Sequence, residues 1–487
     1  MTYEEYRAAL IEGFYQNQLE TLMSGYRKDR PTVILLPGIM GSQLERTNNP
    51  YPSDIAVISD IIWMDVGIAL KKDALKLEID GAGRDTGSYV VAAYGALSFW
   101  SETPYNELRD LARNEQWNYA VFGFDWRRPL SESAEYFKTF VRDFRQRVID
   151  IYGQKWDPLP RLTVVCHSMG GLVATAALRD QNFSGLGFHA VATFGTPFYG
   201  SVTAQNAFYV GLPSLNGLYT APVMAGLIAS MPGAYTLMFL PREVYNQDGP
   251  KLGLNKYPEY DPNGNIPVDP YGPDATVIRR WPKKVKNHLQ YLLDAKQQLI
   301  DIASPINANI ATAFFNIRSS LDKNTAVEVA WNSIDGDNYK PGTDPSPLTG
   351  VGGQPGGDGT VPAWSAWHAY CHSNNRHELK QAKVHGALLE HPEVLGVIKS
   401  IVKQGRLPSA AKPIAKTIGV TVKTKPVATR KKMEKAVALW AKCVEAKKPP
   451  PSEMLEGAVR RAIIIDIMNG PKPPMAKSRA KPNRRKK

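Results

Sequence analysis

The segment RLTVVCHSMGGLVATAALRD, residues 161–180, places Ser168 between an apolar run typical of a strand and one typical of a helix. A tight strand-to-helix turn exposes its central side chain and needs small residues two positions to either side. Those positions hold Cys166 and Gly170, so the pattern is C-H-S-M-G rather than G-x-S-x-G. We expect Ser168 to act as a nucleophile; the alternative is an ordinary turn with a capping serine.

A nucleophilic serine needs a base, and the base needs an acid that orients it; in α/β-hydrolases these follow in the order Ser, acid, His. The glycine-rich loop GGQPGGDGTVPAWSA offers Asp358, with Asp335 and Asp337 as alternatives. Among the later histidines we favour His385, which opens a loop before a helix predicted to begin at Pro392. The remaining late histidines are the N-cap competitor His391 and the surface or core candidates His368, His372 and His377.

Two backbone N–H groups could stabilise the negative oxygen that forms when a serine attacks an ester. One is the N–H of Met169, at the start of the helix after the serine. The other is the N–H of Ile39, in the loop LPGIMGSQL, where Gly38 and Gly41 would let the backbone approach the substrate. A plain glycine turn is the alternative for this loop. We expect His167, beside the serine, to be a packing residue that points away from the site.

The elements that must hold these residues alternate along the chain. Short apolar runs predict buried strands at 32–36, 119–124, 162–166 and 189–195. Helical patterns lie between them, which predicts βαβ units. The expected class is therefore α/β, an α/β-hydrolase fold with a mostly parallel sheet and helices on both faces. Two stretches rich in Pro, Gly and aromatic residues break the rhythm, and we interpret them as a lid at about 45–100 and a cap at about 202–305.

The 487 residues, 43% of them hydrophobic, suffice for a large core. We predict an N-terminal helix in 1–29, a catalytic domain at 30–403, and a C-terminal extension at 404–487 with two helices and a disordered end. Residues 407–487 hold 21 of the 59 Lys and Arg and 5 of the 46 Asp and Glu, a net charge of +16 against −3 for the rest. Such charge beside an apolar helix containing Trp440 suits an anionic membrane surface. A solvated tail is the alternative.

Cysteine usage and the N-terminus limit the setting. Cys166, Cys371 and Cys443 lie far apart without a CxxC pair, so we expect no zinc site, no disulfide framework and no cofactor. The first residues, MTYEEYRAALIEGFYQNQLE, carry acids where a signal peptide would carry bases, and no uninterrupted apolar run reaches about 18 residues. We therefore expect a cytoplasmic protein, with peripheral membrane contact through the extension.

Several segments, taken together, resemble the lecithin:cholesterol acyltransferase family, which includes lysosomal phospholipase and phospholipid:diacylglycerol acyltransferase types. The resemblance covers about residues 30–403. In chain order, the matching segments are VILLPGIMGSQLE, FGFDWR, CHSMGG, FGTPFYGS, MPGAYTL, GDGTVP and the segment around His385. Differences from the family are Phe124 in place of a motif tyrosine, a lid without cysteine, and an extension that matches nothing in the family.

The resemblance implies a triad of Ser168, Asp358 and His385, with Ile39 and Met169 as oxyanion donors. It also implies that the region around Trp63 is a mobile lid near the bound acyl chain. In FGFDWR, either Trp126 lines the site beside the acyl group, or it plugs the strand end next to an Asp125–Arg127 pair. Both interpretations stay open.

The function expected is that of a serine-dependent lipid acyl-ester hydrolase or O-acyltransferase that works through an acyl-enzyme on phospholipid or neutral lipid esters. A peptidase or thioesterase with the same triad is one alternative. Another is a membrane-surface or nucleic-acid binding protein acting through the basic extension; nucleic acid ranks last, because aromatic interleaving and a recognisable binding fold are absent.

Overall fold

The computed structural model describes residues 2–47, 60–63, 77–80, 82–85, 90–97, 103–210, 221–254, 257–260, 269–271, 288–330, 346–349 and 356–408. The alternative acids Asp335 and Asp337 lie outside these residues. Most of the predicted lid and the extension from residue 409 onward also lie outside them.

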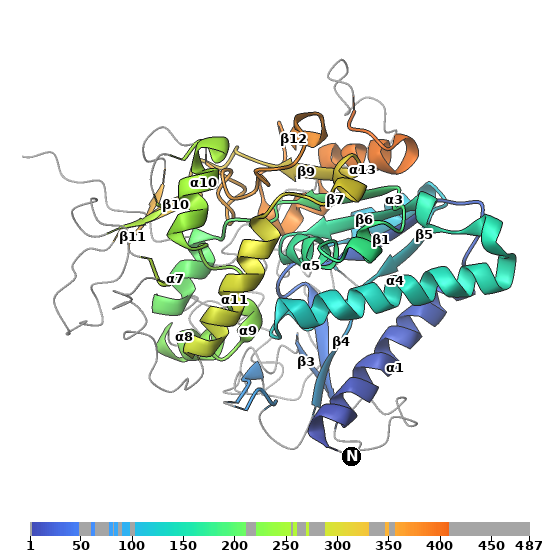
Figure 1. Ribbon diagram of the computed structural model, residues 1–487, viewed down its shortest axis with the longest axis horizontal. Coiled ribbons are helices and arrows are strands. Elements are labelled where there is room, and N and C mark those ends of the chain that lie inside the picture. Colours follow the sequence, from blue (N-terminus) through green and yellow to red (C-terminus); the bar gives the residue numbers. More distant parts are fainter. Residues whose placement is uncertain are drawn as a thin grey trace, which may run out of the picture.

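A six-stranded sheet forms the centre of the molecule, and all of its strand pairs are parallel (Figure 1). The strands are β1 (Thr32–Leu36), β5 (Asn118–Val121), β6 (Leu162–His167), β7 (Ala190–Phe194), β9 (Phe314–Arg318) and β12 (Arg376–Glu378). Their order is β12-β9-β7-β6-β1-β5. The chain leaves β1 toward one edge and returns on its other side at β6, so the strand order reverses between these two neighbours. Ligands bind at such a reversal, beyond the carboxyl ends of the strands.

Helices cover both faces of this sheet, as predicted (Figure 1). On one face lie α1 (Tyr3–Ser24), α4 (Leu130–Tyr152) and α5 (Met169–Ala177). On the other lie α3 (Asn106–Asn114) and α13 (Pro392–Gln404). Short helical turns complete the connections: α6 (Gln181–Ser184), α12 (Ala308–Ala311), η3 (Gln154–Trp156), η4 (Leu159–Arg161), η8 (Ser373–Asn375) and η9 (His385–Glu390).

Two small sheets flank the central one. The first has the order β3-β2-β4 and is antiparallel; its strands are β2 (Ser42–Thr47), β3 (Asp60–Trp63) and β4 (Val90–Ala96). The predicted lid therefore contains regular strands next to the loop after β1. The second has the order β11-β10-β8 and consists of β8 (Glu259–Tyr260), β10 (Ala326–Ala330) and β11 (Ser346–Thr349).

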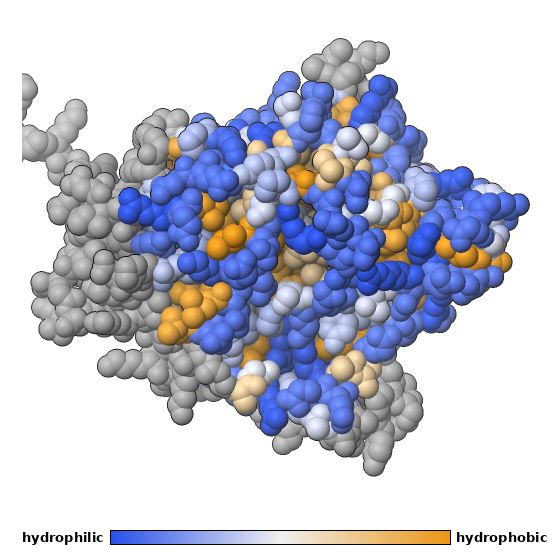
Figure 2. All heavy atoms as spheres, viewed as in Figure 1, coloured by the Kyte–Doolittle hydropathy of each residue, from blue (hydrophilic) through white to orange (hydrophobic). Residues whose placement is uncertain are grey.

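The described part of the predicted cap region is mostly helical and lies to the left of the sheet in Figure 1. It contains α7 (Val202–Val210), α8 (Ala221–Ala229), α9 (Pro232–Tyr235), α10 (Arg242–Leu252) and α11 (His288–Ala303). Helix α11 connects this region to the helices that cover the sheet, because it contacts α9 as well as α4 and α5. Leu289 and Leu293 on α11 are 50% and 48% exposed, and hydrophobic side chains gather over this helix in Figure 2.

Strand β5 ends at Val121, three residues before the predicted end. The reason lies at Gly123, where an added Cβ would be 2.5 Å from the Gly95 carbonyl oxygen. The chain therefore turns out of the central sheet to pack against β4. Among the residues that the structure describes, no helix has the length and apolar character needed to cross a membrane.

Candidate active site

Ser168 follows β6 directly and caps α5, with φ 51° and ψ −124°. Such a backbone conformation is costly for a residue with a Cβ, of the order of 1–3 kcal/mol, and clusters at functional sites. The Ser168 N–H donates to the Phe194 carbonyl at the end of β7 over 2.9 Å, which holds the strained residue in place. The structure therefore has the tight strand–serine–helix turn that the sequence pattern predicted, and a nucleophilic role for Ser168 stays a prediction.

The small residues around the serine are needed because α5 lies very close to its neighbours. A Cβ added at Gly170 would lie 2.4 Å from the carbonyl oxygens of Leu36 and Pro37, at the end of β1. A Cβ added at Gly171 would lie 2.0 Å from the Thr196 hydroxyl. These two glycines therefore allow the helix to begin against β1 and against the loop after β7.

Asp358 and His385 form a buried hydrogen-bonded pair. His385 Nδ1 lies 2.7 Å from Asp358 Oδ2, and each residue is 2% exposed. The other carboxyl oxygen, Oδ1, accepts the N–H groups of Thr360 at 3.1 Å and Val361 at 2.8 Å. The His385 N–H also donates to the Asp358 carbonyl at 2.8 Å. The carboxylate is thus fixed by its own loop and can orient the imidazole.

The end of β7 connects this pair to the serine. Phe194 accepts the Ser168 N–H, and the next residue, Gly195, adopts φ 58°. A Cβ added at Gly195 would lie 2.7 Å from Asp358 Oδ2 and 3.2 Å from His385 Nδ1. The structure therefore gathers the three predicted triad residues around the carboxyl ends of β6 and β7, although 190 positions separate Ser168 from Asp358 in the sequence.

The rival histidines have other roles. His391 caps α13, accepting the Glu393 N–H through its ring nitrogen. His368 is fully buried, its Nε2 lies 2.9 Å from the Ile302 carbonyl, and burial lowers its pKa to about 3. His372 caps a short turn at the surface, and His377 lies in the edge strand β12. Within the described residues, His385 is the histidine whose ring hydrogen-bonds to Asp358.

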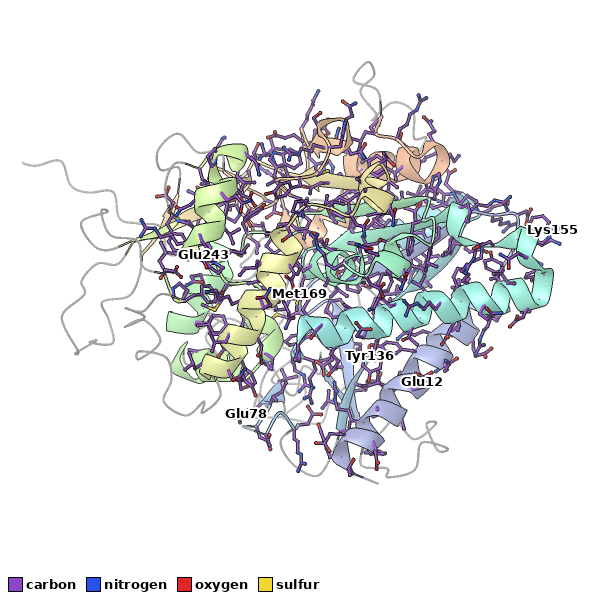
Figure 3. All side chains as sticks on the ribbon, in the orientation of Figure 1. Glu12, Glu78, Tyr136, Lys155, Met169 and Glu243 are labelled. Atoms are coloured by element: carbon purple, nitrogen blue, oxygen red, sulfur yellow. The ribbon has the colours of Figure 1, made fainter. Side chains whose placement is uncertain are left out.

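The predicted oxyanion donors lie at the ends of two paired strands. Ile39 is in the turn after β1, where the Gly41 N–H donates to the Gly38 carbonyl at 2.9 Å and Met40 has φ 61°. Met169 begins α5 in the interior of the molecule (Figure 3). Because Leu36 pairs with residue 166 across β1 and β6, both N–H groups belong to one edge of the sheet. Their role remains a prediction.

Gly38 and Gly41 both lie against protein atoms near the serine turn. A Cβ at Gly38 would lie 2.9 Å from Ser168 Cβ and 3.1 Å from His167 Nδ1. A Cβ at Gly41 would lie 2.6 Å from the Tyr105 hydroxyl. These glycines make room for protein side chains around the serine, and the predicted close approach of this backbone to a substrate stays a prediction.

The expectation that His167 points away from the site is wrong. Its ring lies 4.8 Å from the His385 ring, centroid to centroid, and its Nε2 is 2.9 Å from the His385 carbonyl. Its Nδ1 is 3.3 Å from the hydroxyl of Tyr105, a buried residue that the sequence did not single out. Burial lowers the His167 pKa well below its ordinary value, and the neighbouring His385 lowers it further.

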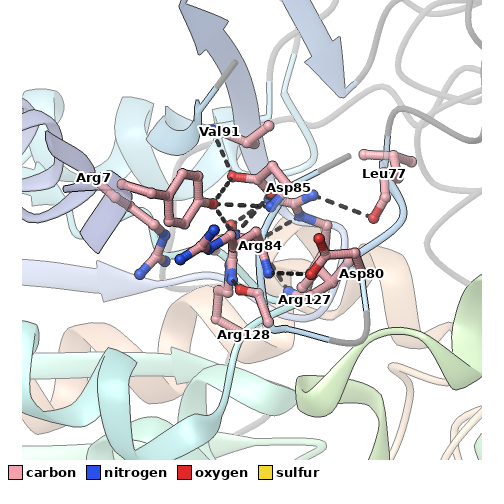
Figure 4. Close-up of polar contacts among 12 residues, drawn as sticks. Arg7, Leu77, Asp80, Arg84, Asp85, Val91, Arg127 and Arg128 are labelled. Carbon is pink, nitrogen blue, oxygen red and sulfur yellow. Dashed lines mark hydrogen bonds and ion pairs between the residues drawn. The ribbon is translucent and has the colours of Figure 1, made fainter. Parts of the chain in front are cut away.

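The segment FGFDWR supplies part of a buried charge network (Figure 4). Arg127 binds Asp125 through both carboxylate oxygens, at 2.9 and 2.7 Å, and Asp85 at 2.8 Å. Burial alone would raise the Asp125 pKa, but the Arg127 charge brings it below its ordinary value. The structure thus contains the predicted Asp–Arg pair.

The structure describes the surroundings of one of the two tryptophans predicted to bind substrate. Trp126 is 1% exposed, and its carbonyl would be 2.2 Å from a Cβ added at Gly233, so FGFDWR and MPGAYTL pack together. Trp63 ends β3 opposite Leu44, and its side chain lies outside the described part of the chain. Contact of either tryptophan with an acyl chain remains a prediction. No group of three or more His, Cys, Asp or Glu side chains in the described residues could hold a metal ion.

Comparison with known proteins supports the fold. The family model of a PGAP1-like alpha/beta domain matches residues 91–215, which include β5, β6, β7 and the turn with Ser168. With the parallel sheet and its helices, this match identifies an α/β-hydrolase fold. The matched model is not that of the lecithin:cholesterol acyltransferase family, so the resemblance to that family remains a prediction.

Among solved structures, one described as "The crystal structure of Tle4-Tli4 complex" has a TM-score of 0.45 and 16% identity, covering 78% of this chain and 99% of the other. The structure of a Bacillus licheniformis lipase, BlEst2 in mature form, has a TM-score of 0.22 and 13% identity, covering 43% and 55%. No curated protein matches this chain.

Proposed function

We propose that this protein is a serine-dependent lipid acyl-ester hydrolase or O-acyltransferase that works through an acyl-enzyme. The observation that carries the proposal is the 2.7 Å hydrogen bond between Asp358 and His385 beside a serine held at φ 51° at the end of β6. This combination of nucleophile turn, buried acid and histidine is what acyl transfer by serine requires.

The hydrogen-bond partners assign the proton on His385. A carboxylate only accepts, so the Nδ1 facing Asp358 carries the ring proton of the neutral imidazole. The Nε2 is then free of a proton and can remove one from the Ser168 hydroxyl as that oxygen attacks the ester carbonyl. The resulting imidazolium returns the proton to the departing alcohol, which leaves the acyl group on Ser168.

The attack converts the ester carbonyl oxygen into an oxyanion. In this proposal the N–H groups of Ile39 and Met169 donate to it, since both come from the edge of the sheet that carries Ser168. A second nucleophile, either water or an alcohol, then attacks the acyl-enzyme with His385 again as base. Trp126 and Trp63 are the side chains we assign to the acyl chain.

The lipid substrate rests on the family resemblance together with the packing of its motifs. Ser201 of FGTPFYGS donates to the Thr360 carbonyl of GDGTVP at 2.9 Å, and its N–H donates to the Leu237 carbonyl of MPGAYTL at 2.9 Å. Three of the motif segments therefore pack against one another, which supports the proposal. Phospholipid incubated with and without a long-chain alcohol, followed by mass spectrometry of the products, distinguishes transfer to alcohol from hydrolysis.

Labelling with a fluorophosphonate tests the nucleophile. We expect the wild-type protein and a Ser131→Ala control, altered at an exposed serine of α4, to be labelled, and Ser168→Ala not to be. Labelling that persists in Ser168→Ala would falsify the proposal, provided that thermal unfolding shows the variant to be folded.

A further inference from the structure

A chain of hydrogen bonds runs beside the candidate site, from the loop after β1 to His385. The Gly38 N–H donates to the Tyr105 hydroxyl oxygen at 3.1 Å. That hydroxyl lies 3.3 Å from His167 Nδ1. The other ring nitrogen of His167, Nε2, lies 2.9 Å from the His385 carbonyl oxygen. Four residues from four different segments are thereby connected through one histidine.

The direction of each hydrogen bond follows from the donors available. A carbonyl oxygen only accepts, so His167 Nε2 carries a proton and donates it to His385. His167 is buried and its pKa is lowered well below the ordinary value, so the ring is neutral and Nδ1 carries no proton. Nδ1 therefore accepts from Tyr105, whose oxygen accepts from Gly38. In this chain of hydrogen bonds, each donor therefore faces an acceptor.

This chain of hydrogen bonds holds His385, the candidate base, by its backbone. The backbone N–H of His385 already donates to the Asp358 carbonyl at 2.8 Å. The hydrogen bond from His167 fixes the other backbone polar group of His385, its carbonyl oxygen. With the side chain bonded to Asp358, His385 is restrained at its N–H, its carbonyl and its ring.

The same chain of hydrogen bonds restrains the loop that carries Ile39. The Gly38 N–H is buried and accepted by Tyr105, and the Tyr105 hydroxyl fills the space that a Cβ at Gly41 would occupy. Tyr105 is 1% exposed and sits at the start of α3, with its ring edge-on to His167. Because His167 is covalently next to Ser168, the nucleophile, the base and the loop share one set of contacts.

We propose that His167 and Tyr105 are positioning residues that set the distance between Ser168, the His385 backbone and the oxyanion loop. This rests on the proposed function, since the residues act only through groups assigned to acyl transfer there. Small displacements of reacting groups lower the rate of the chemical step strongly while leaving ground-state binding nearly unchanged. The two side chains should therefore affect kcat more than KM.

Two substitutions of His167 separate its two nitrogens. Asn places an amide near the position of Nδ1 and cannot reach the His385 carbonyl, whereas Gln extends to the position of Nε2 and can donate to it. We expect kcat for a short-chain aryl ester to fall about tenfold or more in His167→Asn and clearly less in His167→Gln, with KM changed less than twofold. Tyr105→Phe, which removes the hydroxyl, should lower kcat about tenfold.

The controls exclude a merely structural effect. Tyr152→Phe, at the end of α4, should leave kcat unchanged, and assays run well below each variant's midpoint of thermal unfolding keep all proteins folded. Equal kcat values for His167→Asn, His167→Gln and wild type, or a change in KM alone, would overturn the positioning role while Ser168-dependent labelling of the wild type still upheld the proposed function. Wild-type protein that does not react at Ser168 would overturn both.

Discussion

Three buried histidines differ in the groups that their rings contact, and these contacts determine what each ring can do. His385 faces a carboxylate and can serve as a base, His167 bridges a hydroxyl and a carbonyl, and His368 donates to a backbone carbonyl in the core. Motif order and a position in the loop before a predicted helix pointed to His385, and the structure brings this residue into contact with Asp358. Tyr105 could not be found in the same way, because TPYNEL belongs to no motif and its contact with His167 joins positions 62 residues apart.

The buried state of His368 predicts a loss of stability in acid. Its pKa in the folded protein is about 3, below the value of about 6.5 expected when unfolded, so the unfolded state binds the extra proton between these pH values. Its contribution is therefore complete above pH 6.5 and declines as the pH falls toward 3. We expect about 2 kcal/mol of unfolding free energy to be lost through His368 between pH 7 and pH 5.

Urea unfolding at both pH values measures this loss. His368→Gln should narrow the difference in unfolding free energy between pH 7 and pH 5, whereas His372→Gln, at an exposed position, should keep the wild-type difference. An unchanged difference in His368→Gln would contradict the assignment.

At the scale of elements, predictability followed burial. Three of the apolar runs became β1, β6 and β7, which are buried along their whole length, because strands buried on both faces consist of continuous apolar residues. The fourth contributes to β5, an edge strand in which buried and half-buried residues alternate. Strands β9 and β12 escaped prediction: β9 contains Asn316 and Arg318, and β12 is the Arg-His-Glu edge strand. The serine turn was predictable from its neighbours, but the reason for the glycines at 170 and 171 is tertiary, since it depends on contacts with β1 and with the loop after β7.

The close approach of α5 predicts that Gly170→Ala is destabilising. The added methyl group meets two backbone carbonyl oxygens at 2.4 Å, which cannot rotate away, so helix and strand must separate. We expect a loss of about 1–3 kcal/mol in unfolding free energy, as for other overpacked cores. Labelling of Ser168 should slow in parallel, since the turn moves with the helix.

Gly226→Ala in α8 is the matched control. An added Cβ there meets nothing within 4 Å, so the higher helix propensity of Ala should leave stability unchanged or raise it by up to about 1 kcal/mol. Denaturant unfolding of the two variants side by side checks the prediction, and equal stabilities would contradict it.

At the scale of the whole molecule, Asp85 ties distant segments together (Figure 4). It accepts from Arg127 at 2.8 Å, from Arg128 at 2.9 Å, from the Tyr3 hydroxyl at 2.9 Å and from the Val91 N–H at 2.9 Å. The N-terminal helix, strand β4 and the loop after β5 thus meet at one buried carboxylate.

Removing this carboxylate should be costly. Asp85→Ala leaves the Arg127 and Arg128 charges buried with fewer partners, and we expect a loss of about 3–5 kcal/mol in unfolding free energy. Asp150→Ala, at an exposed site of α4, should change the stability by less than about 0.5 kcal/mol. Thermal or urea unfolding measures both, and a small effect at Asp85 would show that the network contributes little.

The distribution of charge predicts where an anionic membrane would bind. Residues 407–487 carry a net charge of +16, against −3 for the rest of the chain. We expect a chain ending at Pro408 to lose binding to phosphatidylserine vesicles, since each basic residue near such a surface contributes about 1 kcal/mol of binding free energy. The same chain should keep Ser168 labelling. Neutral phosphatidylcholine vesicles are the control. Vesicle binding that survives the truncation would contradict membrane docking through this extension.

The position of His385 in the chain has a consequence for biosynthesis. The turn with Ser168 lies between β6 and α5, but His385 follows the last strand of the central sheet and begins η9, the short turn before α13. During translation, Ser168 is therefore synthesised long before His385, the base in the proposed mechanism. If the proposed function holds, fluorophosphonate labelling of Ser168 should appear only late during translation, after residue 385 has left the ribosome.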